Sequence, residues 1–322
     1  MKPITLDELK EKAFEFGWDD MGSCKAEIPA SDISFYLSWI KHAFHGELHY
    51  MEKEMRCYPQ EILPGAKTAI IFLSHYKQEH VPFFKNKGVV ASYARHRDYH
   101  NVHRKRLKRY IRWLEERSGQ EGIARGFSDS KPVLEKALAV QAGLGWMGKN
   151  SLLIHRKFGT FTLLSGIFTT LELPIYLGPD LRKPKCGTCT RCLDACPTKA
   201  IVAPYTVNAS KCLSYHLIES KGPVAKEASE KNPGYIFGCD ICQDVCPHNV
   251  RPPLASHPDF TENGVGAYLT ESDIDQFIKE PERLYGTPLN RRGASGLKHS
   301  AQALFSRPLE SPPSEDKAHE EF

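Results

Sequence analysis

The chain has 322 residues, 41% of them hydrophobic and 25% charged, and a formal net charge of +4 at pH 7. This composition excludes a disordered chain and indicates a globular protein with room for one large domain or two ordinary ones. No apolar run approaches the roughly 20 residues that span a membrane, and the amphipathic N-terminus resembles neither a signal nor a transit peptide. We therefore expect a cytoplasmic protein without a membrane segment.

Strand and helix patterns alternate along the first 180 residues. In chain order we expect a helix at 6–17, strands at 66–76 and 89–94, a helix at 98–119, a strand at 123–129, a helix from Pro132 to Gly143, and two strands within 150–170 joined by a turn at 157–159. Helices interleaved with strands predict an α/β (α+β) domain over residues 1–180.

Three further segments follow this domain. Residues 181–250 are rich in cysteine and poor in apolar residues, which predicts a compact unit held by metal. Residues 251–306 form a C-terminal helical segment, and residues 307–322 are rich in Pro, Ser and Glu and are expected to be disordered.

The stretch 142–150 contains Gly143, Gly145 and Gly148 at the spacing of a dinucleotide-binding loop. That loop needs a strand before it and a helix after it. Here a predicted helix precedes the glycines and a predicted strand follows them, so the nucleotide interpretation fails. A helix C-cap explains Gly143, but leaves the conjunction with Trp146, Lys149 and Asn150 unexplained.

Eight of the ten cysteines lie between Cys186 and Cys246, whereas Cys24 and Cys57 stand alone and are expected to be ordinary thiols. The first four have the C-x2-C-x2-C-x3-C-P spacing of bacterial ferredoxins, whose fourth cysteine binds the other cluster. A second run lacks one cysteine, which Cys212 supplies. The predicted ligands are Cys186, Cys189, Cys192 and Cys246 for one 4Fe–4S cluster and Cys196, Cys212, Cys239 and Cys242 for the other. Zinc is the alternative metal.

Two clusters make a one-electron relay, and about 180 residues precede them. An electron carrier needs little more than the cluster segment, so the extra chain favours a redox enzyme. A ferredoxin-type carrier with an enlarged scaffold stays open as the alternative; it predicts iron and sulfide but no further cofactor.

Several stretches together resemble the epoxyqueuosine reductases: HGELHYMEKEMR, RDYHNVHRKRLKRY, SDSKPVLEKALAVQAGLGWMGKNSLLI, and the cysteine runs with NASKCLSY and GCDICQDVCPHN. The resemblance implies a cobalamin-binding reductase core with a ferredoxin-like module that carries two 4Fe–4S clusters. It implies reduction of epoxyqueuosine to queuosine at the wobble position of tRNA, by a monomer fed by an external electron donor. A corrinoid reductase of another substrate, such as an organohalide, is the alternative within this class.

The resemblance also assigns residues. Asp129 matches the catalytic acid, and as a proton donor it should have a pKa raised by burial against the corrin; a helix N-cap is its ordinary alternative. Asp98, Tyr99 and His100 are expected near the substrate, and Lys149 and Asn150 at the corrin. The positions that match cobalamin contacts are Arg56, Ala91, Asp129, Leu153, Leu164, Cys239 and Asp240.

For the tRNA, the resemblance points to Lys136 and Ser214, and we add Arg291, Arg292 and Lys298 near the C-terminus. The stretch 103–112 holds six Lys and Arg, which is ordinarily a solvated helix face, and a tRNA substrate makes it a candidate phosphate-binding face. The chain departs from the family at His96, where many members have glycine, and at His299-Ser300, where an Arg-Asn pair is usual.

Overall fold

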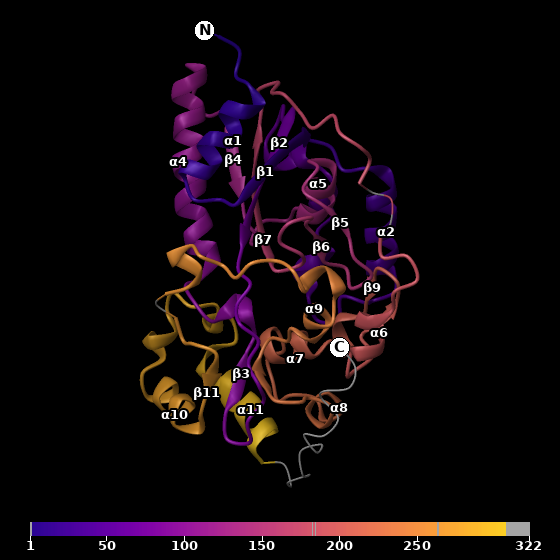
Figure 1. The fold of residues 1–322 in the computed structure, drawn as a ribbon, viewed down its shortest axis with the longest axis vertical. Coiled ribbons are helices and arrows are strands. Elements are labelled where there is room, and N and C mark those ends of the chain that lie inside the picture. The colour runs from indigo at the N-terminus through magenta and orange to yellow at the C-terminus, as the bar shows by residue number, and fades with distance from the viewer. Residues whose placement is uncertain (1, 182, 184, 263, 307–322) are drawn as a thin grey trace.

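The computed structural model describes residues 2–181, 183, 185–262 and 264–306. The first half contains α1 (Leu6–Glu15), β1 (Asp20–Lys25), α2 (Ala30–Lys41), α3 (Pro59–Ile62), β2 (Thr68–His75), β3 (Gly88–Val90), α4 (Tyr99–Ser118), β4 (Ala124–Phe127), α5 (Glu135–Gln141), β5 (Trp146–Met147), β6 (Leu153–Ile154) and β7 (Thr162–Thr169) (Figure 1). The second half contains α6 (Arg191–Ala195), β8 (Ile201–Ala203), β9 (Thr206–Val207), α7 (Leu213–Ile218), α8 (Lys226–Glu230), β10 (Tyr235–Phe237), α9 (Ile241–Asp244), β11 (Tyr268–Leu269), α10 (Glu271–Lys279) and α11 (Gly293–Phe305). Within these residues, no helix combines the length and the apolar character needed to cross a membrane.

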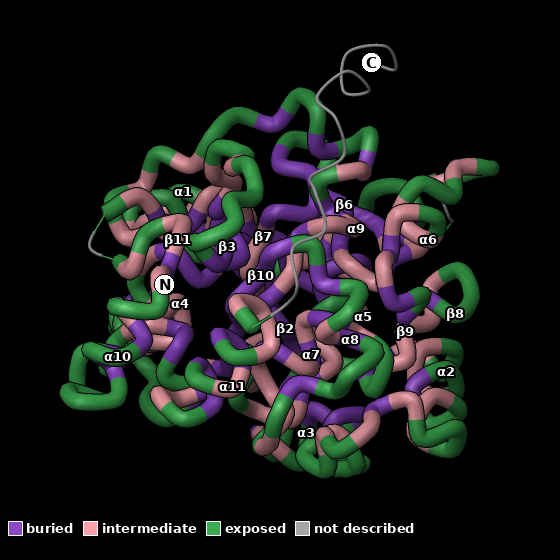
Figure 2. The backbone as a smooth tube through the Cα atoms, turned by 90° about the horizontal axis from the view of Figure 1, so that it is seen from below, coloured by how far each residue is buried: buried purple, intermediate pink, exposed green. Residues whose placement is uncertain are grey.

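A four-stranded sheet in the order β1-β2-β7-β4 forms the centre, and every neighbouring pair is antiparallel. All residues of β2 are buried, because apolar clusters cover both faces of the strand. Ile71 and Leu73 pack toward α5, whereas Ile70 and Phe72 pack toward α1 and α4. Alternate residues of a strand face opposite sides of the sheet. A strand that is covered on both sides therefore needs apolar residues at every position, and this continuous apolar run is the pattern that predicted β2. Figure 2 shows buried chain gathered around β2 and β7, with α2 and α10 at the periphery.

A smaller sheet has the order β10-β3-β11. Its central strand comes from the first half of the chain and pairs parallel with β10 and antiparallel with β11. Val90 shares a core with residues of β10, α10 and α11. Residues 88–94 therefore pack with the second half of the chain, and the domain boundaries at 180 and 250 stay predictions.

Most predicted elements are present, and the differences have local causes. The strand expected at 89–94 ends at Val90, and Ser92–Ala94 form a 3-10 turn. The helix expected from Pro132 begins at Glu135, because the preceding residues form a turn around Asp129, whose φ is +53°. No strand was predicted at β1, whose sequence DMGSCK lacks the β-branched and aromatic residues that favour strands. The tail expected to be disordered, 307–322, lies outside the described residues.

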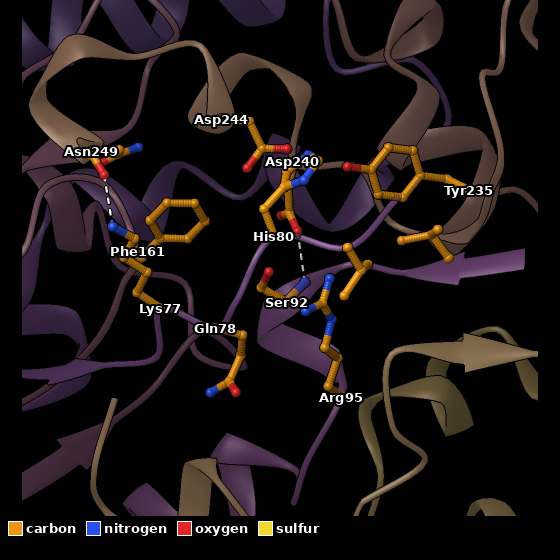
Figure 3. Close-up of a pocket in the computed structure, with 12 residues that line it drawn as sticks. Lys77, Gln78, His80, Ser92, Arg95, Phe161, Tyr235, Asp240, Asp244 and Asn249 are labelled. Atoms are coloured by element: carbon orange, nitrogen blue, oxygen red, sulfur yellow. Dashed lines mark hydrogen bonds between the residues drawn. The ribbon is translucent and has the colours of Figure 1, made fainter. Parts of the chain in front are cut away.

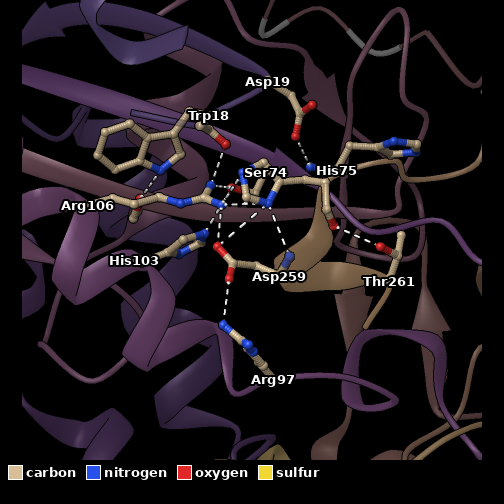
Figure 4. A network of polar contacts seen from close by, with 12 residues as sticks. Trp18, Asp19, Ser74, His75, Arg97, His103, Arg106, Asp259 and Thr261 are labelled. Atoms are coloured by element: carbon tan, nitrogen blue, oxygen red, sulfur yellow. Dashed lines mark hydrogen bonds and ion pairs between the residues drawn. The ribbon is translucent and has the colours of Figure 1, made fainter. Parts of the chain in front are cut away.

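A polar network ties α4 to the C-terminal half of the chain (Figure 4). Arg106, which is buried on α4, donates to Asp259 at 2.9 Å and lies 3.2 Å from the ring nitrogens of His257. The same guanidinium donates to the carbonyl of Gly17 and the hydroxyl of Ser74. One arginine of the basic stretch is thus a structural residue with its charge compensated inside the fold.

Candidate active site and cluster segment

Asp129 lies in the turn between β4 and α5 with a left-handed backbone, φ +53°. Aspartate and asparagine adopt this conformation more readily than bulkier residues. The turn is fixed by a hydrogen bond of 2.7 Å from the Asp129 N–H to Oε1 of Glu135, in the first turn of α5. The Asp129 side chain is 64% exposed, so its carboxylate is accessible to a substrate. It does not cap the helix as an N-cap residue would.

Two side chains from the first turn of α4 contact the Asp129 carboxylate. Tyr99 Oη donates to Oδ2 at 2.9 Å, and His100 Nε2 lies 3.1 Å from the same oxygen. The other ring nitrogen of His100 lies 2.7 Å from Oδ1 of Asp98, which is the N-cap of α4. The structure therefore brings together the residues that the sequence analysis expected near the substrate.

The protonation of this group is set by its neighbours. Partial desolvation by neighbouring groups disfavours the charge of Asp129, but the hydrogen bond and charge of His100, with Tyr99 and Arg291, outweigh it and lower the pKa. The protein neighbours of Asp129 thus lower its pKa, and the rise expected from burial against the corrin stays a prediction. Burial opposes protonation of His100, yet its bonds to Asp129 and Asp98 raise its pKa to about 9. At neutral pH the pair holds its proton on the histidine.

Glu135 is a residue that the sequence analysis missed. Burial, and then the charge of Asp129, raise the pKa of Glu135 to about 8, so it accepts the Asp129 N–H as a largely neutral acid. A glutamate in the first turn of a helix is common because of the helix dipole. Its sequence position therefore gave no signal of this contact.

The candidate cobalamin contacts are mostly buried. Arg56 donates through Nη2 to the carbonyl of Tyr50 at 3.2 Å, and its buried Nε has no hydrogen-bond partner among the described residues. Such an unsatisfied donor is costly and fits a ligand that supplies an acceptor. Leu153 is buried in the β5–β6 hairpin, and Leu164 on β7 accepts a bond from Ser128, next to Asp129.

The remaining candidate contacts converge where β3 meets the second cysteine run. A Cβ on Gly238 would stand 2.6 Å from the Cβ of Ala91, so the two backbones are in close approach. The N–H of Ser92 donates to Asp240 Oδ2 at 2.7 Å. A cavity of about 260 Å³ opens beside Asp240, lined also by Arg95, Tyr235 and Asp244 (Figure 3). Ala91 and Cys239 do not line it.

The cysteines fall into two groups. Burial raises the pKa of Cys246, and the nearby thiols of Cys186, Cys192 and Cys189 raise it further. Burial likewise raises the pKa of Cys242, with Cys212 and Cys196 as the next causes, and Cys239 responds to Cys242 and Cys212. These neighbourhoods are the two ligand sets expected from the ferredoxin spacing, in which the last cysteine of each run joins the other group.

The separation of the sulfur atoms bears on the metal. All eight cysteines are described, and no three of them have sulfur atoms within 4.8 Å of one another. Four thiolates on one zinc ion, at a Zn–S distance of about 2.3 Å, would stand roughly 3.8 Å apart. The spacing is thus too wide for a single zinc ion and leaves room for a larger inorganic core.

The glycine-containing stretch holds the cluster segment to the sheet. Gly143 has φ +80° at the end of α5, and a Cβ on Gly145 would stand 2.3 Å from the carbonyl oxygen of Ile154. Gly143 therefore ends a helix and Gly145 allows a tight hairpin. This agrees with the sequence-based conclusion that the stretch is not a nucleotide-binding loop. Lys149 Nζ donates to the carbonyls of Gly187 and Cys189 at 2.7 and 2.9 Å.

Asn150 makes a similar contact, because its amide donates to the carbonyl of Cys242 at 3.2 Å. Lys149 and Asn150 were expected at the corrin. The structure shows that both side chains bond to the backbone of the cysteine loops, and their place at the corrin stays a prediction.

The candidate tRNA contacts differ in accessibility. Lys136 and Lys298 are exposed, and Ser214 is half-buried on α7. Arg292 is buried and donates to the carbonyl of Gly222, whereas Arg291 beside it is exposed and pairs with Glu219 at 2.6 Å. On α4 the exposed cations are Arg104, Lys105, Lys108, Arg109 and Arg112.

The backbone accommodates the two departures from the family pattern, but His96 Nδ1 and His299 Nδ1 are buried and have no hydrogen-bond partner among the described residues. His96 lies in the bend before α4 and is not among the non-glycine residues with a positive φ, so its position does not require glycine. Ser300 lies inside α11, where its hydroxyl donates to the carbonyl of Gly296.

Comparison with known proteins supports this arrangement. The family model "4Fe-4S double cluster binding domain" matches residues 185–249, and "Epoxyqueuosine reductase QueG, DUF1730" matches residues 56–130. The chain is 38% identical over 303 residues to an epoxyqueuosine reductase of Cellulophaga algicola, covering 92% of this chain and 97% of that one. It is 35% identical to the enzyme of Pseudomonas aeruginosa, covering 93% and 85%.

Solved structures agree. A crystal structure of epoxyqueuosine reductase with an epoxyqueuosine-modified tRNA-Tyr stem loop matches with a TM-score of 0.81 and 25% identity, covering 92% of this chain and 80% of that one. The Bacillus subtilis enzyme, in a structure whose catalytic aspartate loop is swung out of the active site, matches with a TM-score of 0.79, 26% identity and the same coverage. The sequence resemblance is thus confirmed, and the chain belongs to the epoxyqueuosine reductase family.

Proposed function

We propose that this chain reduces epoxyqueuosine to queuosine at the wobble position of tRNA, and that Asp129 and His100 together deliver the proton. The observation that carries the proposal is the exposed Asp129 carboxylate, hydrogen-bonded to a histidine that is protonated at neutral pH. Opening the epoxide to an alkene consumes two electrons and two protons and releases the oxygen as water. A site for this reaction therefore needs an electron supply and an acid beside the departing oxygen.

The candidate cofactors are cobalamin and two 4Fe–4S clusters. When bound, they would supply low-valent cobalt and the electrons that maintain it. Two sets of four cysteines would hold the clusters, and their separation supports this. Arg56, with an unsatisfied buried Nε, and the close approach of Ala91 to Gly238 support a large ligand bound mainly by backbone and one cation.

The protein residues handle the proton. His100 holds it, with Asp98 stabilising the imidazolium from the side away from the substrate. Asp129 Oδ2 accepts from His100 and Tyr99, and is the exposed atom that can pass a proton outward. Protonation of the leaving oxygen by a positioned acid contributes typically 10²–10⁴-fold to a rate. Glu135 holds the Asp129 turn through its bond to the Asp129 N–H.

The tRNA would approach the same surface. Arg291 lies near enough to lower the pKa of Asp129 and stacks over the Tyr50 ring at 5.5 Å. An arginine over an aromatic ring beside an acid is suited to a splayed nucleotide, because unpaired bases stack on such groups. We further propose that the enzyme works in the cytoplasm, where its tRNA substrate lies. On this proposal the enzyme is a monomer, and an external donor supplies its electrons.

The test is Asp129→Asn, which suits the left-handed backbone and removes only the acid. We expect turnover of an epoxyqueuosine-containing anticodon stem loop to fall by about 10²–10⁴-fold, while bound iron and bound cobalamin stay at wild-type levels. Asp275→Asn, an exposed change on α10, is the matched control and should leave turnover unchanged.

Full activity of Asp129→Asn would return Asp129 to a purely structural role in its turn. The substrate is tested separately. Cells that lack this protein should accumulate epoxyqueuosine in their tRNA, and if they do not, the tRNA assignment is wrong.

A further inference from the structure

The loop from Cys186 to Cys189 lies at the protein surface. Gly187 and Thr188 are exposed between Cys186 and Cys189, whereas Gly238, Asp240 and Leu213, which flank Cys239 and Cys212 of the other group, are buried. A Cβ on Gly187 would meet no atom within 4 Å. One thin layer of chain therefore separates this cysteine group from solvent. Electron tunnelling weakens steeply with distance, so this loop is the favourable entry for electrons.

Cations surround the loop. The exposed side chains of Lys183, Lys185, Arg191 and Arg251 form what we call the basic rim. Within the described part of the chain, no ion pair joins any of these four to a carboxylate. Two exposed carboxylates are close to these cations in the sequence: Asp180, and Asp194 on α6, which accepts a hydrogen bond from Thr190 at 2.6 Å. The local excess of charge is thus positive and available to a partner.

The basic rim adjoins the second cysteine run through the buried ring of Trp146. Lys185 Nζ lies 4.9 Å from the centre of the Trp146 ring, and that ring lies 5.2 Å from the ring of His248. His248 follows Cys246 by two residues and precedes Val250, which is 75% exposed, and then Arg251. The surface therefore combines an exposed apolar side chain with a ring of cations over a cysteine group. Figure 2 shows α6, which carries Arg191, at the edge of the molecule.

We propose that the basic rim docks a small acidic protein that carries one electron at a time. This inference rests on the proposed function and identifies where its electrons enter. Each encounter would oxidise one carrier and reduce the cluster held by Cys186, Cys189, Cys192 and Cys246 by one electron. Two encounters supply the two electrons of one epoxide reduction, and the two protons come from solvent through the Asp129 site.

The chemistry favours a protein over an RNA at this surface. Complementary charge accelerates the encounter of two proteins and makes it salt-dependent. A polar rim around an apolar centre is the usual anatomy of a protein interface. A phosphate backbone would use the cations but gain nothing from Val250. The tRNA must also present its modified base to Asp129, which lies among Tyr50, Tyr99 and His100 rather than over the cysteine loop.

The experiment compares two triple charge reversals in the enzyme loaded with its clusters. The test variant is K183E/K185E/R191E, and the matched control K85E/K279E/R283E reverses three exposed cations. Two of the control sites lie on α10 or just after it, on the other side of the molecule from α6 (Figure 1). The probe is a [2Fe–2S] ferredoxin of net negative charge, and its Kd is measured by titration calorimetry at low and high salt.

We expect the test variant to bind the ferredoxin at least about tenfold more weakly than the wild type, and the wild type to weaken by a similar factor as salt rises. The control variant should bind within about twofold of the wild type, and iron content should be equal in all three. Equal binding by test and control variants would overturn the proposal. A test variant that loses affinity for the anticodon stem loop while keeping ferredoxin affinity would overturn it in favour of RNA.

Dithionite, a small reductant that needs no docking surface, separates this inference from the proposed function. The test variant should reduce epoxyqueuosine at the wild-type rate with dithionite and more slowly with ferredoxin. If wild-type enzyme loaded with its cofactors is inactive with dithionite, the proposed function fails, and the ferredoxin titration still decides the docking surface.

Discussion

The central sheet and the cluster segment, residues 185–249, are held together by different means. The sheet has apolar clusters on both faces, and β2 is buried along its whole length. Within the cluster segment, the part around the first cysteine run has a small core of Cys196, Ala200 and Ile201, packed mostly against further cysteines. The part from Leu213 to Tyr235 has an apolar cluster of its own that packs with Val89. The difference teaches that the sheet can fold on its own side chains, whereas the part around the first cysteine run depends on its metal.

Removal of iron should expose this contrast most strongly. Metal binding in a segment with little core of its own is folding free energy, and residues 186–201 are such a segment. We expect iron-free protein to exchange the backbone amides of residues 186–201 faster by more than about 10²-fold, with β2 and β7 still protected. Hydrogen exchange with mass spectrometry measures both regions in one sample. Equal protection of residues 186–201 with and without iron would remove the distinction.

Phe72→Ala tests the other region. Phe72 is fully buried, stacks on Trp18 at 4.0 Å and packs edge-on against Tyr110. Its truncation should lower the free energy of unfolding by about 3–5 kcal/mol, while iron content and the absorbance of the clusters stay at wild-type levels. Phe14→Ala, at a side chain that is 47% exposed, is the control and should have little effect. Loss of iron from Phe72→Ala would show that the two regions unfold as one unit.

Lys149→Ala acts where the two regions meet. The ammonium bonds to two carbonyls of the Cys186–Cys189 loop, and hydrogen bonds to a charged group contribute about 1.5–3 kcal/mol each. We expect faster release of iron to a chelator, by about tenfold, with little change in the stability of the sheet. Lys226→Ala, on the exposed face of α8, should release iron at the wild-type rate. An unchanged rate in Lys149→Ala would mean that the loop is held by iron alone.

The smallest expected effect is the pH dependence of turnover, which is set by His100 on α4, a helix that packs on the central sheet. The pKa of His100 is raised to about 9 in the fold. The imidazole is therefore fully protonated at a pH below the ordinary histidine pKa, and it loses its proton as the pH rises through about 9. Single-turnover reduction should then fall by about tenfold per pH unit above that point. Asp98→Asn removes one of the carboxylates that raise this pKa and should move the falling limb to lower pH. A profile flat to pH 10 would exclude His100 as the proton source.

The ligand spacing of the cysteines and most helices and strands of the central sheet could be predicted from the sequence, and for the same reason. Ligand spacing and hydrophobic periodicity are local properties, so a short stretch contains the whole signal. The buried run of β2 and the glycine that ends α4 are such cases. β1 escaped prediction because DMGSCK owes its place to pairing with β2 rather than to its own composition.

The features of the site that the sequence could not predict come from contacts between distant segments. The pKa of Asp129 depends on His100, which lies on α4, and the expectation of a raised pKa did not include that partner. Lys149 and Asn150 were assigned to the corrin from the resemblance, which stays a prediction, and only the fold shows that both also bond to the cysteine loops. Arg292 was grouped with its exposed neighbour Arg291, although burial separates the two.

The Arg106 network sets a lower bound on how short a working version of this protein can be. Arg106 is buried on α4, and its carboxylate partner is Asp259, far along the chain from the sheet. A truncated protein that stops after the last cysteine would keep every predicted cluster ligand but remove the carboxylate that bonds to Arg106, leaving Asp19 as the acid that still acts on the guanidinium. Breaking a buried pair in this way costs about 3–5 kcal/mol. The smallest autonomous unit therefore extends at least through Asp259.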